Sequence, residues 1–268
     1  MSQLLKNGQT VRTQSGQACR VRSLLGAGGQ GEVYRAEWTG QDFALKWYHA
    51  HTATAAQRAT LERLVSVHKA PSDRFLWPLD LALSDDVSGF GYVMRLREPR
   101  FRGLLDLMLN RIDPTFAALV QASFDLVDSF FKLHADGLCY RDISFGNVFF
   151  DPKTGDVLIC DNDNVTENRS PITGILGTPD FMAPEIVRGD ALPSRQTDLF
   201  SLAVLLFYLF HVGHPLQGKR ILQIRCWDLP ARRKLFGNEP LFIFDPRDAT
   251  NAAVGTDIDP LGEAGANA

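Results

Sequence analysis

The sequence has no surplus of positive charge. Its 268 residues include 28 Lys and Arg against 31 Asp and Glu, so the formal net charge is -3 at pH 7. Nucleic acids and anionic membranes are held by a broad basic field, which this balance does not provide. We therefore expect neither nucleic acid nor a membrane as a partner, and any phosphate-binding site must be local.

Paired cysteines and long hydrophobic runs are also missing. The N-terminus lacks the apolar core of a signal peptide, and the most apolar run, residues 199–212, is shorter than the roughly 20 residues that span a bilayer. We expect reduced thiols, a cytoplasmic location and a buried helix over that run. The four cysteines are far apart, without a C-x-x-C pair, at Cys19, Cys139, Cys160 and Cys226.

The hydrophobic pattern divides the chain into a sheet-rich part and a helical part. Hydrophobic residues make up 45% of the chain, which is enough for one large core or two unequal ones. A 3.6-residue period predicts one helix in the first part, over residues 54–68, with Thr52 or Thr54 as its N-cap. Alternation of apolar and polar residues predicts strands over residues 10–13, 18–25, 32–38 and 42–48.

Helical signals dominate after residue 97. A long helix is predicted from Asp113, as N-cap, to Gly137, as the C-terminal stop. A second buried helix is expected over residues 198–212, and two short strands over residues 148–150 and 157–160.

These elements predict an α+β fold of two lobes. The sheet and one helix would form the N-lobe over residues 1–95, and the other helices the C-lobe over residues 96–249. Residues 250–268 are rich in Ala, Gly, Asp and Asn and have no periodicity, which predicts a flexible tail or linker. Clefts between such lobes are common ligand sites.

A glycine-rich motif lies between the second and third predicted strands. Its pattern G-x-G-x-x-G, at Gly26, Gly28 and Gly31, lets backbone amides approach a phosphate. Alone the motif is weak, because a Gly-rich hairpin turn has the same composition. The strand that follows disfavours dinucleotide-binding and Walker sites, which need a helix N-terminus there.

One lysine, Lys46, lies in the apolar strand over residues 42–48. Burying its ammonium is costly unless an anion is present, so Lys46 either pairs with an anion or lies at an exposed sheet edge. Glu62 is the one carboxylate between Lys46 and Asp73. A Lys46–Glu62 ion pair would hold the ammonium ready for phosphates.

Two polar clusters follow, at residues 140–147 and 160–163. A hydroxyl that attacks a phosphoryl group needs a carboxylate to orient it and accept its proton, which suits Asp142. Mg²⁺ prefers hard oxygen ligands, which suits Asn147 and Asp161. Each residue alone is equally compatible with a turn or a helix cap, so the order and spacing of the motifs carry the interpretation.

In this order the motifs resemble those of the protein kinase family, over roughly residues 15–247. The resemblance includes Ala44-x-Lys46 and the segment 177–185, and it implies a two-lobed protein-kinase-like fold with ATP and Mg²⁺ as cofactors. It implies catalytic roles for Lys46, Glu62, Asp142, Asn147 and Asp161, with Asn147 and Asp161 as metal ligands. The implied nucleotide-binding residues are Leu25, Gly26, Gly28, Gly31, Val33, Ala44, Lys46, Met94, Arg95, Leu96 and Arg97.

The same resemblance implies supporting residues. Met94 would be the gatekeeper, and Arg95–Arg97 the hinge that meets adenine. Thr178 resembles the threonine that braces the catalytic loop in Ser/Thr kinases, and Asp198 resembles the buried aspartate that ties this loop to the long apolar helix.

Autophosphorylation is predicted between Asp161 and Glu185. Ser170 and Thr173 are the preferred sites, and Arg141 could pair with the phosphate. The alternative is that these hydroxyls are ordinary polar loop residues.

Several positions depart from the family pattern. Tyr140 replaces the usual His, and Ser144 replaces a phosphate-binding Lys, so we expect slower transfer or another cation. Residues 161–163 read Asp-Asn-Asp in place of Asp-Phe-Gly, which removes the aromatic ring of an apolar stack. Asp163 would be either a metal-facing carboxylate or an exposed loop charge, and the exposed charge is favoured.

Together these features predict a Ser/Thr protein kinase that transfers the γ-phosphoryl group of ATP to protein hydroxyls. The alternative is a pseudokinase, an ATP-binding interaction module without turnover, which Tyr140, Ser144 and Asn162 would mark. A small-molecule phosphotransferase is less favoured, because the segment 177–185 resembles the part that seats a peptide.

A narrower resemblance concerns partners. The phrases at residues 75–78, 91–94 and 140–144 resemble bacterial kinases that accompany a von Willebrand factor A protein and a PPM-type phosphatase. This resemblance implies those partners in addition to a protein substrate. The final helices of the family look reduced, which fits either a compact lobe or a kinase that is part of a longer protein.

Overall fold

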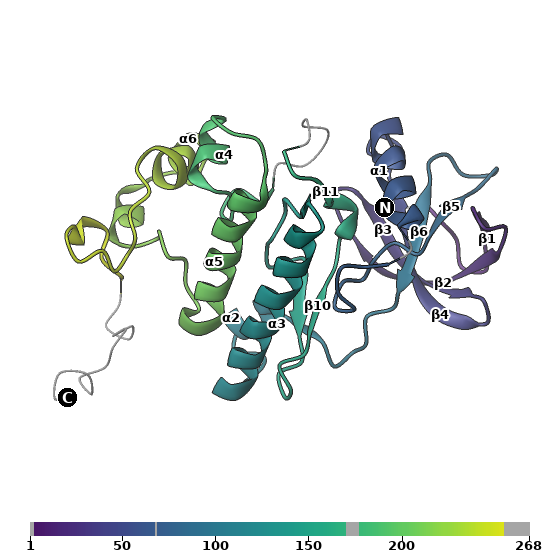
Figure 1. Cartoon of the computed structure of the whole chain (residues 1–268), viewed down its shortest axis with the longest axis horizontal. Coiled ribbons are helices and arrows are strands. Elements are labelled where there is room, and N and C mark those ends of the chain that lie inside the picture. The colour runs from purple at the N-terminus through teal and green to yellow at the C-terminus, as the bar shows by residue number, and fades with distance from the viewer. Residues whose placement is uncertain (1–2, 68, 170–176, 255–268) are drawn as a thin grey trace.

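The structure is a computed structural model, which describes residues 3–67, 69–169 and 177–254. Figure 1 shows a sheet-rich N-terminal lobe, a central helical region and short helices toward the C-terminus. The two-lobed α+β architecture predicted from the sequence is therefore confirmed.

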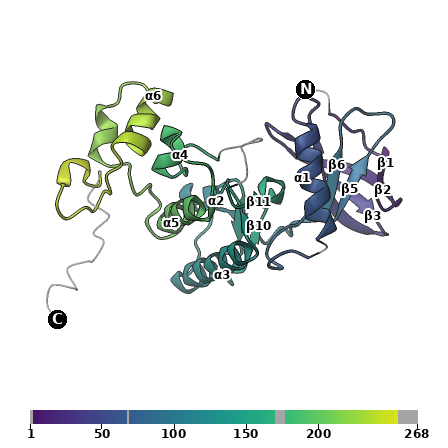
Figure 2. The same ribbon diagram turned by 45° about the horizontal axis from the view of Figure 1, so that its top comes forward.

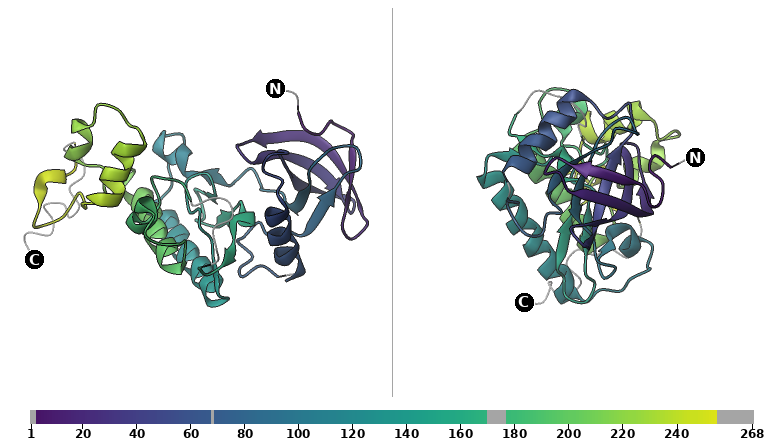
Figure 3. Two further views of the ribbon diagram at one scale, coloured as in Figure 1. Left: turned by 90° about the horizontal axis from the view of Figure 1, so that it is seen from above. Right: turned by 90° about the vertical axis from the view of Figure 1, so that its right-hand side faces the viewer.

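The N-terminal lobe is a closed antiparallel barrel, seen from the side of the N-terminus in the right-hand view of Figure 3. Inward-facing side chains such as Val21, Tyr34 and Leu45 are fully buried and form its core. In pairing order, the strands are β1 (Thr10–Thr13), β2 (Ala18–Ala27), β3 (Gly31–Trp38), β4 (Gln41–Tyr48), β6 (Gly91–Arg95) and β5 (Asp80–Leu83), and β5 pairs with β1.

One helix, α1 (Ala55–Ser66), lies between the barrel and the second lobe (Figure 2). It begins after Thr54, whose hydroxyl accepts a hydrogen bond from the backbone N–H of Gln57 at 3.2 Å. Thr54 is thus the N-cap, one of the two residues predicted for this role. Leu61 and Leu64 form the buried face of the helix.

The second lobe is built around two long helices that lie side by side in Figures 1 and 2, α3 (Phe116–Ala135) and α5 (Arg195–His211). α5 is the buried helix predicted for the most apolar run, and no helix of the described residues is long and apolar enough to cross a membrane. The shorter elements are β7 (Arg102–Gly103), α2 (Leu104–Met108), β8 (Leu138–Cys139), β9 (Val148–Phe150), β10 (Val157–Ile159), β11 (Thr166–Glu167), α4 (Pro184–Arg188) and α6 (Leu229–Arg232).

Both long helices begin at residues that differ from the prediction. The N-cap of α3 is Thr115, whose hydroxyl accepts a hydrogen bond from the backbone N–H of Ala118 at 3.2 Å. Asp113 lies two residues earlier and is not the N-cap. α5 begins at Arg195, three residues before the predicted start, and its N-cap Ser194 forms a capping box with Thr197. Gly137, with φ of 80°, follows the end of α3 as predicted.

A short segment after α1 links the two lobes. The N–H of Leu76 donates to the carbonyl of Ile159 at 2.8 Å, and the N–H of Ile159 donates to the carbonyl of Arg74 at 2.9 Å. The N-lobe chain therefore pairs directly with β10 of the C-lobe, and this pairing fixes one end of the cleft between them.

The packed structure extends beyond the predicted boundary at residue 249. Asn251 is fully buried, and its amide donates to the carbonyls of Leu216 at 2.9 Å and Leu241 at 2.7 Å. Its amide oxygen accepts from the N–H of Gly218 at 3.2 Å. The expectation of a flexible tail from residue 250 is therefore wrong at Asn251, and residues 255–268 lie outside the described part.

A buried histidine, His214, connects the segment before α4 to the C-terminal part of the lobe. Its Nε2–H donates to the carbonyl of Asp180 at 2.7 Å, and its Nδ1 accepts from the N–H of Leu216 at 2.9 Å. Both contacts are satisfied together only when the ring is neutral. Burial lowers the pKa of His214 to about 4.

We expect acid to destabilise the protein through His214. The unfolded chain takes up this proton near the usual pKa of about 6.5, whereas the folded protein resists it until about pH 4. The free energy of unfolding should therefore fall as the pH drops through this window, by about 3 kcal/mol in total.

Urea unfolding of the wild type and of His214→Gln at several pH values checks this expectation. The Gln amide can still donate to Asp180 but does not titrate, so the variant should lose less stability on acidification. Equal losses in the two proteins would contradict the role of His214.

Candidate active site

Two adjoining cavities lie in the cleft between the lobes. One, of about 340 Å³, is lined mainly by apolar side chains, and the other, of about 440 Å³, by the glycine loop, Lys46, Asp142 and Asp161. Asp161 lines both. Every nucleotide-binding residue predicted from the sequence lines one or both cavities, namely Leu25, Gly26, Gly28, Gly31, Val33, Ala44, Lys46, Met94, Arg95, Leu96 and Arg97.

The smaller cavity has apolar walls from both lobes. Antiparallel pairing of β4 with β6 sets Ala44 opposite Met94, and both are buried. Phe149 of β9 contributes from the C-lobe, and the guanidinium of Arg97 lies 4.2 Å from the centre of its ring. A cavity with apolar walls and the chain of residues 95–97 along one edge suits a planar heteroaromatic ring.

The glycine loop is the hairpin between β2 and β3, and it borders the larger cavity. A Cβ at Gly31 would lie 2.1 Å from the backbone oxygen of Trp47, whereas at Gly26 and Gly28 it would meet no atom within 4 Å. Gly31 is therefore required for β3 to pair with β4. Gly26 and Gly28 instead keep side chains out of the space beside the cavity.

Two residues fix the carboxylate of Asp142 at the larger cavity. Thr178 donates its hydroxyl to Oδ1 of Asp142 at 2.7 Å, as the sequence predicted for a bracing threonine. The amide of Asn147 donates to Oδ2 of Asp142 at 3.1 Å and to its backbone oxygen at 2.8 Å. A carboxylate oriented in this way can position a hydroxyl and accept its proton.

A second carboxylate, Asp198 of α5, anchors the loop that carries Asp142. It is buried and accepts from the backbone N–H of Tyr140 at 2.6 Å and of Arg141 at 2.9 Å, and it contacts Nε2 of His134 at 3.0 Å. Arg141 has φ of 75°, in the left-handed region that is uncommon for a residue with a side chain. The predicted tie between this loop and the apolar helix is confirmed, and it holds the loop in that conformation.

Asn147 and Asp161 offer oxygen atoms of the kind that Mg²⁺ prefers. The amide nitrogen of Asn147 is used by Asp142, which leaves its amide oxygen, and Lys46 contacts Oδ1 of Asp161 at 3.3 Å, which leaves Oδ2. This pair fits Mg²⁺, which commonly takes one or two protein oxygens and completes its shell with water and phosphate. Among the described residues no cluster of three or more His, Cys, Asp and Glu forms an all-protein metal site.

Lys46 does not pair with Glu62, contrary to the prediction. Its ammonium lies 3.0 Å from Oδ2 of Asp163, 3.3 Å from Oδ1 of Asp161 and 2.9 Å from the amide oxygen of Gln30. Burial opposes the charge, but the two carboxylates outweigh it and raise the pKa of Lys46 above its usual value. The buried lysine is therefore charged.

Glu62 points away from Lys46 because of its position around α1. Leu61 and Leu64 define the buried face of the helix, and Gln57, four residues before Leu61, shares that face. Glu62 instead forms a half-exposed ion pair with Arg58 at 2.9 Å. The distance of Glu62 from Lys46 along the chain does not say which side of the helix it lies on. The positions of Leu61 and Leu64 do, and they place Gln57 on the side that faces Lys46.

Asp163 is neither metal-facing nor exposed, so both expectations for it are wrong. Its side chain is fully buried and contacts Lys46, the hydroxyls of Tyr48 and Tyr92, and the amide of Gln57, the Tyr92 bond measuring 3.0 Å and the Gln57 contact 3.5 Å. It is buried because the N-lobe supplies this set of donors. Burial, reinforced by Asp163, raises the pKa of Tyr48 and Tyr92, so both hydroxyls remain donors.

The polar partners that surround Lys46 were not predicted from the sequence. Tyr48 lies two residues after Lys46 and so shares its face of β4, and Tyr92 lies directly opposite Lys46 on β6. Two tyrosines on one face of an apolar sheet, beside a lysine, are a signal for a buried anion. Nothing comparable in the sequence marks Gln30. Gln57 is marked only by lying on the same side of its helix as Leu61 and Leu64.

Asn162, the polar residue that replaces the usual Phe in the triplet 161–163, is buried inside the protein. Asn162 is fully buried, and its amide donates to the carbonyl of Ile159 at 3.0 Å, while its Oδ1 has no partner among the described residues. Tyr140 is also fully buried, packs edge-on against Phe130 and donates its hydroxyl to the carbonyl of Cys160. An aromatic ring thus lies beside the triplet, although it comes from the preceding loop.

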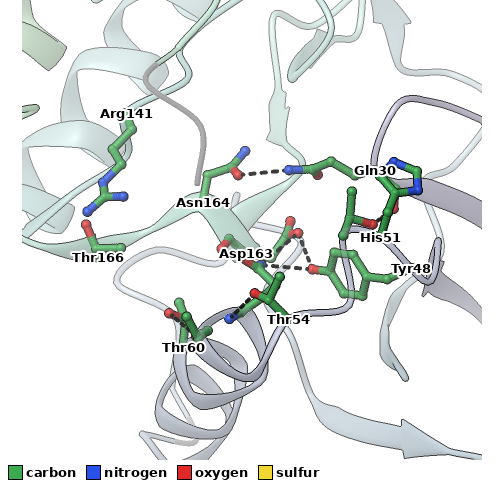
Figure 4. A pocket seen from close by; sticks show the side chains of 12 residues that line it. Gln30, Tyr48, His51, Thr54, Thr60, Arg141, Asp163, Asn164 and Thr166 are labelled. Carbon is green, nitrogen blue, oxygen red and sulfur yellow. Dashed lines mark hydrogen bonds between the residues drawn. The ribbon is translucent and has the colours of Figure 1, made fainter. Parts of the chain in front are cut away.

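A third cavity, of about 450 Å³, lies beside α1 (Figure 4). Arg141 lines it and is only 7% exposed, and its Nε has no hydrogen-bond partner among the described residues. Figure 4 shows its guanidinium directed toward Thr166. Arg141 is therefore a largely buried cation at the wall of this cavity, and a guanidinium in such a place can pair with an anion.

Comparisons with known proteins agree with this geometry. The sequence matches the profile of the protein kinase domain over residues 19–236. It is 28% identical over 204 residues to the DNA damage-responsive serine/threonine-protein kinase RqkA of Deinococcus radiodurans, covering 73% of this chain and 30% of that protein. It is 30% identical over 222 residues to the serine/threonine-protein kinase PkaB of Streptomyces coelicolor, covering 73% of this chain and 50% of that protein. The chain thus spans half or less of the length of these two relatives.

A solved structure has the same fold. Vaccinia related kinase 3 is similar with a TM-score of 0.63 at 17% sequence identity, over 87% of this chain and 74% of that one. At this identity the likeness establishes the shared two-lobed architecture.

We expect Gly31 and Gly28 to differ sharply in their tolerance of a methyl group. Gly31→Ala forces a Cβ against the backbone of Trp47 and should lower the free energy of unfolding by about 2–3 kcal/mol. Gly28→Ala meets open space and should change it by less than about 0.5 kcal/mol. Thermal and urea unfolding without nucleotide measure both, and equal effects would contradict the distinction.

Proposed function

The chain belongs to the protein kinase domain family, and from this premise we propose that it transfers the γ-phosphoryl group of ATP to Ser and Thr hydroxyls of proteins. One observation carries the proposal: Asp142 is oriented by Thr178 and Asn147 at the cavity that also holds the glycine loop, Lys46 and Asp161. Phosphoryl transfer depends mainly on positioning and charge, and this cavity collects the groups that provide both.

Each residue of the cavity has a distinct part in the proposed reaction. Asp142 accepts the proton of the attacking hydroxyl, and Lys46 contacts the α- and β-phosphates of ATP. Asn147 and Asp161 would hold Mg²⁺, which neutralises charge on the phosphates when bound. The smaller apolar cavity would take adenine against Ala44 and the chain of residues 95–97. Glu62 has no part in this mechanism.

The choice of Ser and Thr as acceptors rests on two supports. Thr178 bonds to Asp142 in the way the resemblance to Ser/Thr kinases implies, and the two bacterial relatives are named as serine/threonine-protein kinases. The von Willebrand factor A and PPM phosphatase partners, and a cytoplasmic location, stay predictions.

A pseudokinase that binds ATP without turnover is the competing function. It is favoured by the buried polar Asn162 in the triplet and by Ser144 in place of a cation. An assay of phosphoryl transfer from labelled ATP separates the two functions, because a pseudokinase would bind ATP and transfer no label.

We expect Asp142→Asn to reduce phosphoryl transfer by at least about 100-fold, because the amide cannot accept the proton. Lys46→Ala should also abolish measurable transfer. Purified variants would be incubated with labelled ATP, Mg²⁺ and a generic basic protein. Asp85→Asn, on an exposed loop, is the matched control and should behave as wild type.

Two outcomes would count against the kinase proposal. Label that persists in Asp142→Asn would assign the transfer to another residue or to a contaminant. No transfer by the wild type, together with a melting temperature raised by ATP and Mg²⁺, would favour the pseudokinase.

The cavity beside α1 supports autophosphorylation. Arg141 is a largely buried cation that lines this cavity, and a phosphate added nearby could pair with its guanidinium. Thr178 is occupied by Asp142, so we favour Ser170 and Thr173, which lie outside the described residues.

Mass spectrometry after incubation with ATP and Mg²⁺ tests this proposal. We expect phosphate on Ser170 or Thr173 and none on Thr178, and no modification in the Asp142→Asn variant. An unmodified segment 161–185 in an active wild-type enzyme would overturn the assignment.

A further inference from the structure

We propose that Asp163 is the positioning residue for Lys46, in place of a carboxylate on helix α1. The place of the lysine is then set by the segment that follows β10, and it does not require Glu62. This inference rests on the proposed function, because Lys46 is placed here for the phosphates of ATP.

The contacts of Lys46 favour Asp163 over the other anions. Both carboxylate oxygens of Asp163 lie within hydrogen-bond distance of the ammonium, at 3.0 and 3.1 Å, while Asp161 offers one oxygen at 3.3 Å. The side chain of Asp163 has no exposed surface, whereas 37% of the Asp161 side chain is exposed. Asp161 can therefore turn to a ligand in the cavity, and Asp163 stays with the lysine.

Helix α1 offers no competing anion. Glu62 is its one carboxylate, and it is held by Arg58 on the outer face. The residue that α1 presents inward is Gln57, whose amide donates to the backbone oxygen of Asp163 and to the hydroxyl of Tyr48, both at 3.2 Å. The helix thus contributes a neutral donor to the cluster.

Asp163 is itself fixed from several sides. Tyr48 of β4 and Tyr92 of β6 donate their hydroxyls to its two oxygens, and Gln57 approaches from α1. A buried carboxylate is tolerated only when such donors and a cation surround it. The same contacts make Asp163 a rigid anchor, so its position determines where the ammonium of Lys46 lies.

The decisive experiment compares the carboxylates of Asp163 and Glu62 as partners of Lys46. Asp163→Asn removes the anion at nearly constant shape, Glu62→Gln removes the helix carboxylate as the matched comparison, and Gln57→Glu with Asp163→Asn returns an anion to the cluster from α1. Lys46→Met defines the effect of losing the ammonium. Calorimetry measures the affinity of each variant for ATP without Mg²⁺.

We expect Asp163→Asn to weaken ATP binding on the order of tenfold, because charge-assisted contacts orient the ammonium. Glu62→Gln should bind as the wild type does. Adding Asp163→Asn to Lys46→Met should cause little further loss, and the Gln57→Glu exchange should recover part of the affinity. A residue needed only for folding would show neither the missing additivity nor the recovery.

Three results would overturn the inference. These are wild-type affinity in Asp163→Asn, a loss in Glu62→Gln that matches Lys46→Met, and an equal loss from Asp163→Asn with and without Lys46. If Asp163→Asn does not fold, Glu62→Gln and the double exchange still decide between the two anchors.

A measurement without nucleotide separates this inference from the proposed function. Double-mutant cycles on the melting temperature compare the coupling of Lys46 with Asp163 and of Lys46 with Glu62. We expect coupling only with Asp163. If that coupling is found but no phosphoryl transfer occurs, the proposed function fails and the anchor stands; the reverse pattern would leave a kinase with a different anchor.

Discussion

The buried ion pair between Lys46 and Asp163 is the contact on which the cleft depends. Neither charge could be withdrawn from water alone, because an isolated buried ion costs several kcal/mol. Paired, they join strand β4 of the barrel to the segment after β10, and Tyr48 and Tyr92 complete the carboxylate's hydrogen bonds. This cluster holds the glycine loop and Asp161 on the same cavity.

The carboxylates of the site divide into structural and chemical ones. Asp163 and Asp198 are buried and saturated, the first by side-chain donors and the second by two backbone N–H groups and His134. Asp142 and Asp161 line the larger cavity and keep oxygen atoms available to it. The first pair fixes the two loops on which the second pair lies, so the positions of the reactive carboxylates are set mainly by buried residues beside them in the chain.

The sequence predicted β1 to β4, β9, β10, the long helices and the cavity-lining residues, because these depend on local periodicity and on the order of motifs, whereas β5, β6 and three two-residue strands were not predicted. It failed where the outcome depends on which way a side chain faces. The prediction of a Lys46–Glu62 pair rests on Glu62 being the one carboxylate between Lys46 and Asp73, although Leu61 and Leu64 turn it outward. Asp163 was assigned to an exposed loop, because its donors lie more than seventy residues earlier in the chain, on elements that meet it only after folding.

The closed barrel limits how other chains can attach to the N-lobe. Pairing of Arg12 with Leu83 and of Thr13 with Ala82 closes the sheet between β1 and β5. A strand-adding peptide needs a free sheet edge with unpaired backbone groups, and the pairing of β1 with β5 removes that edge where the two strands meet. The same closure removes a common template for edge-to-edge aggregation. Another protein that recognises this lobe at β1 and β5 must therefore contact side chains there.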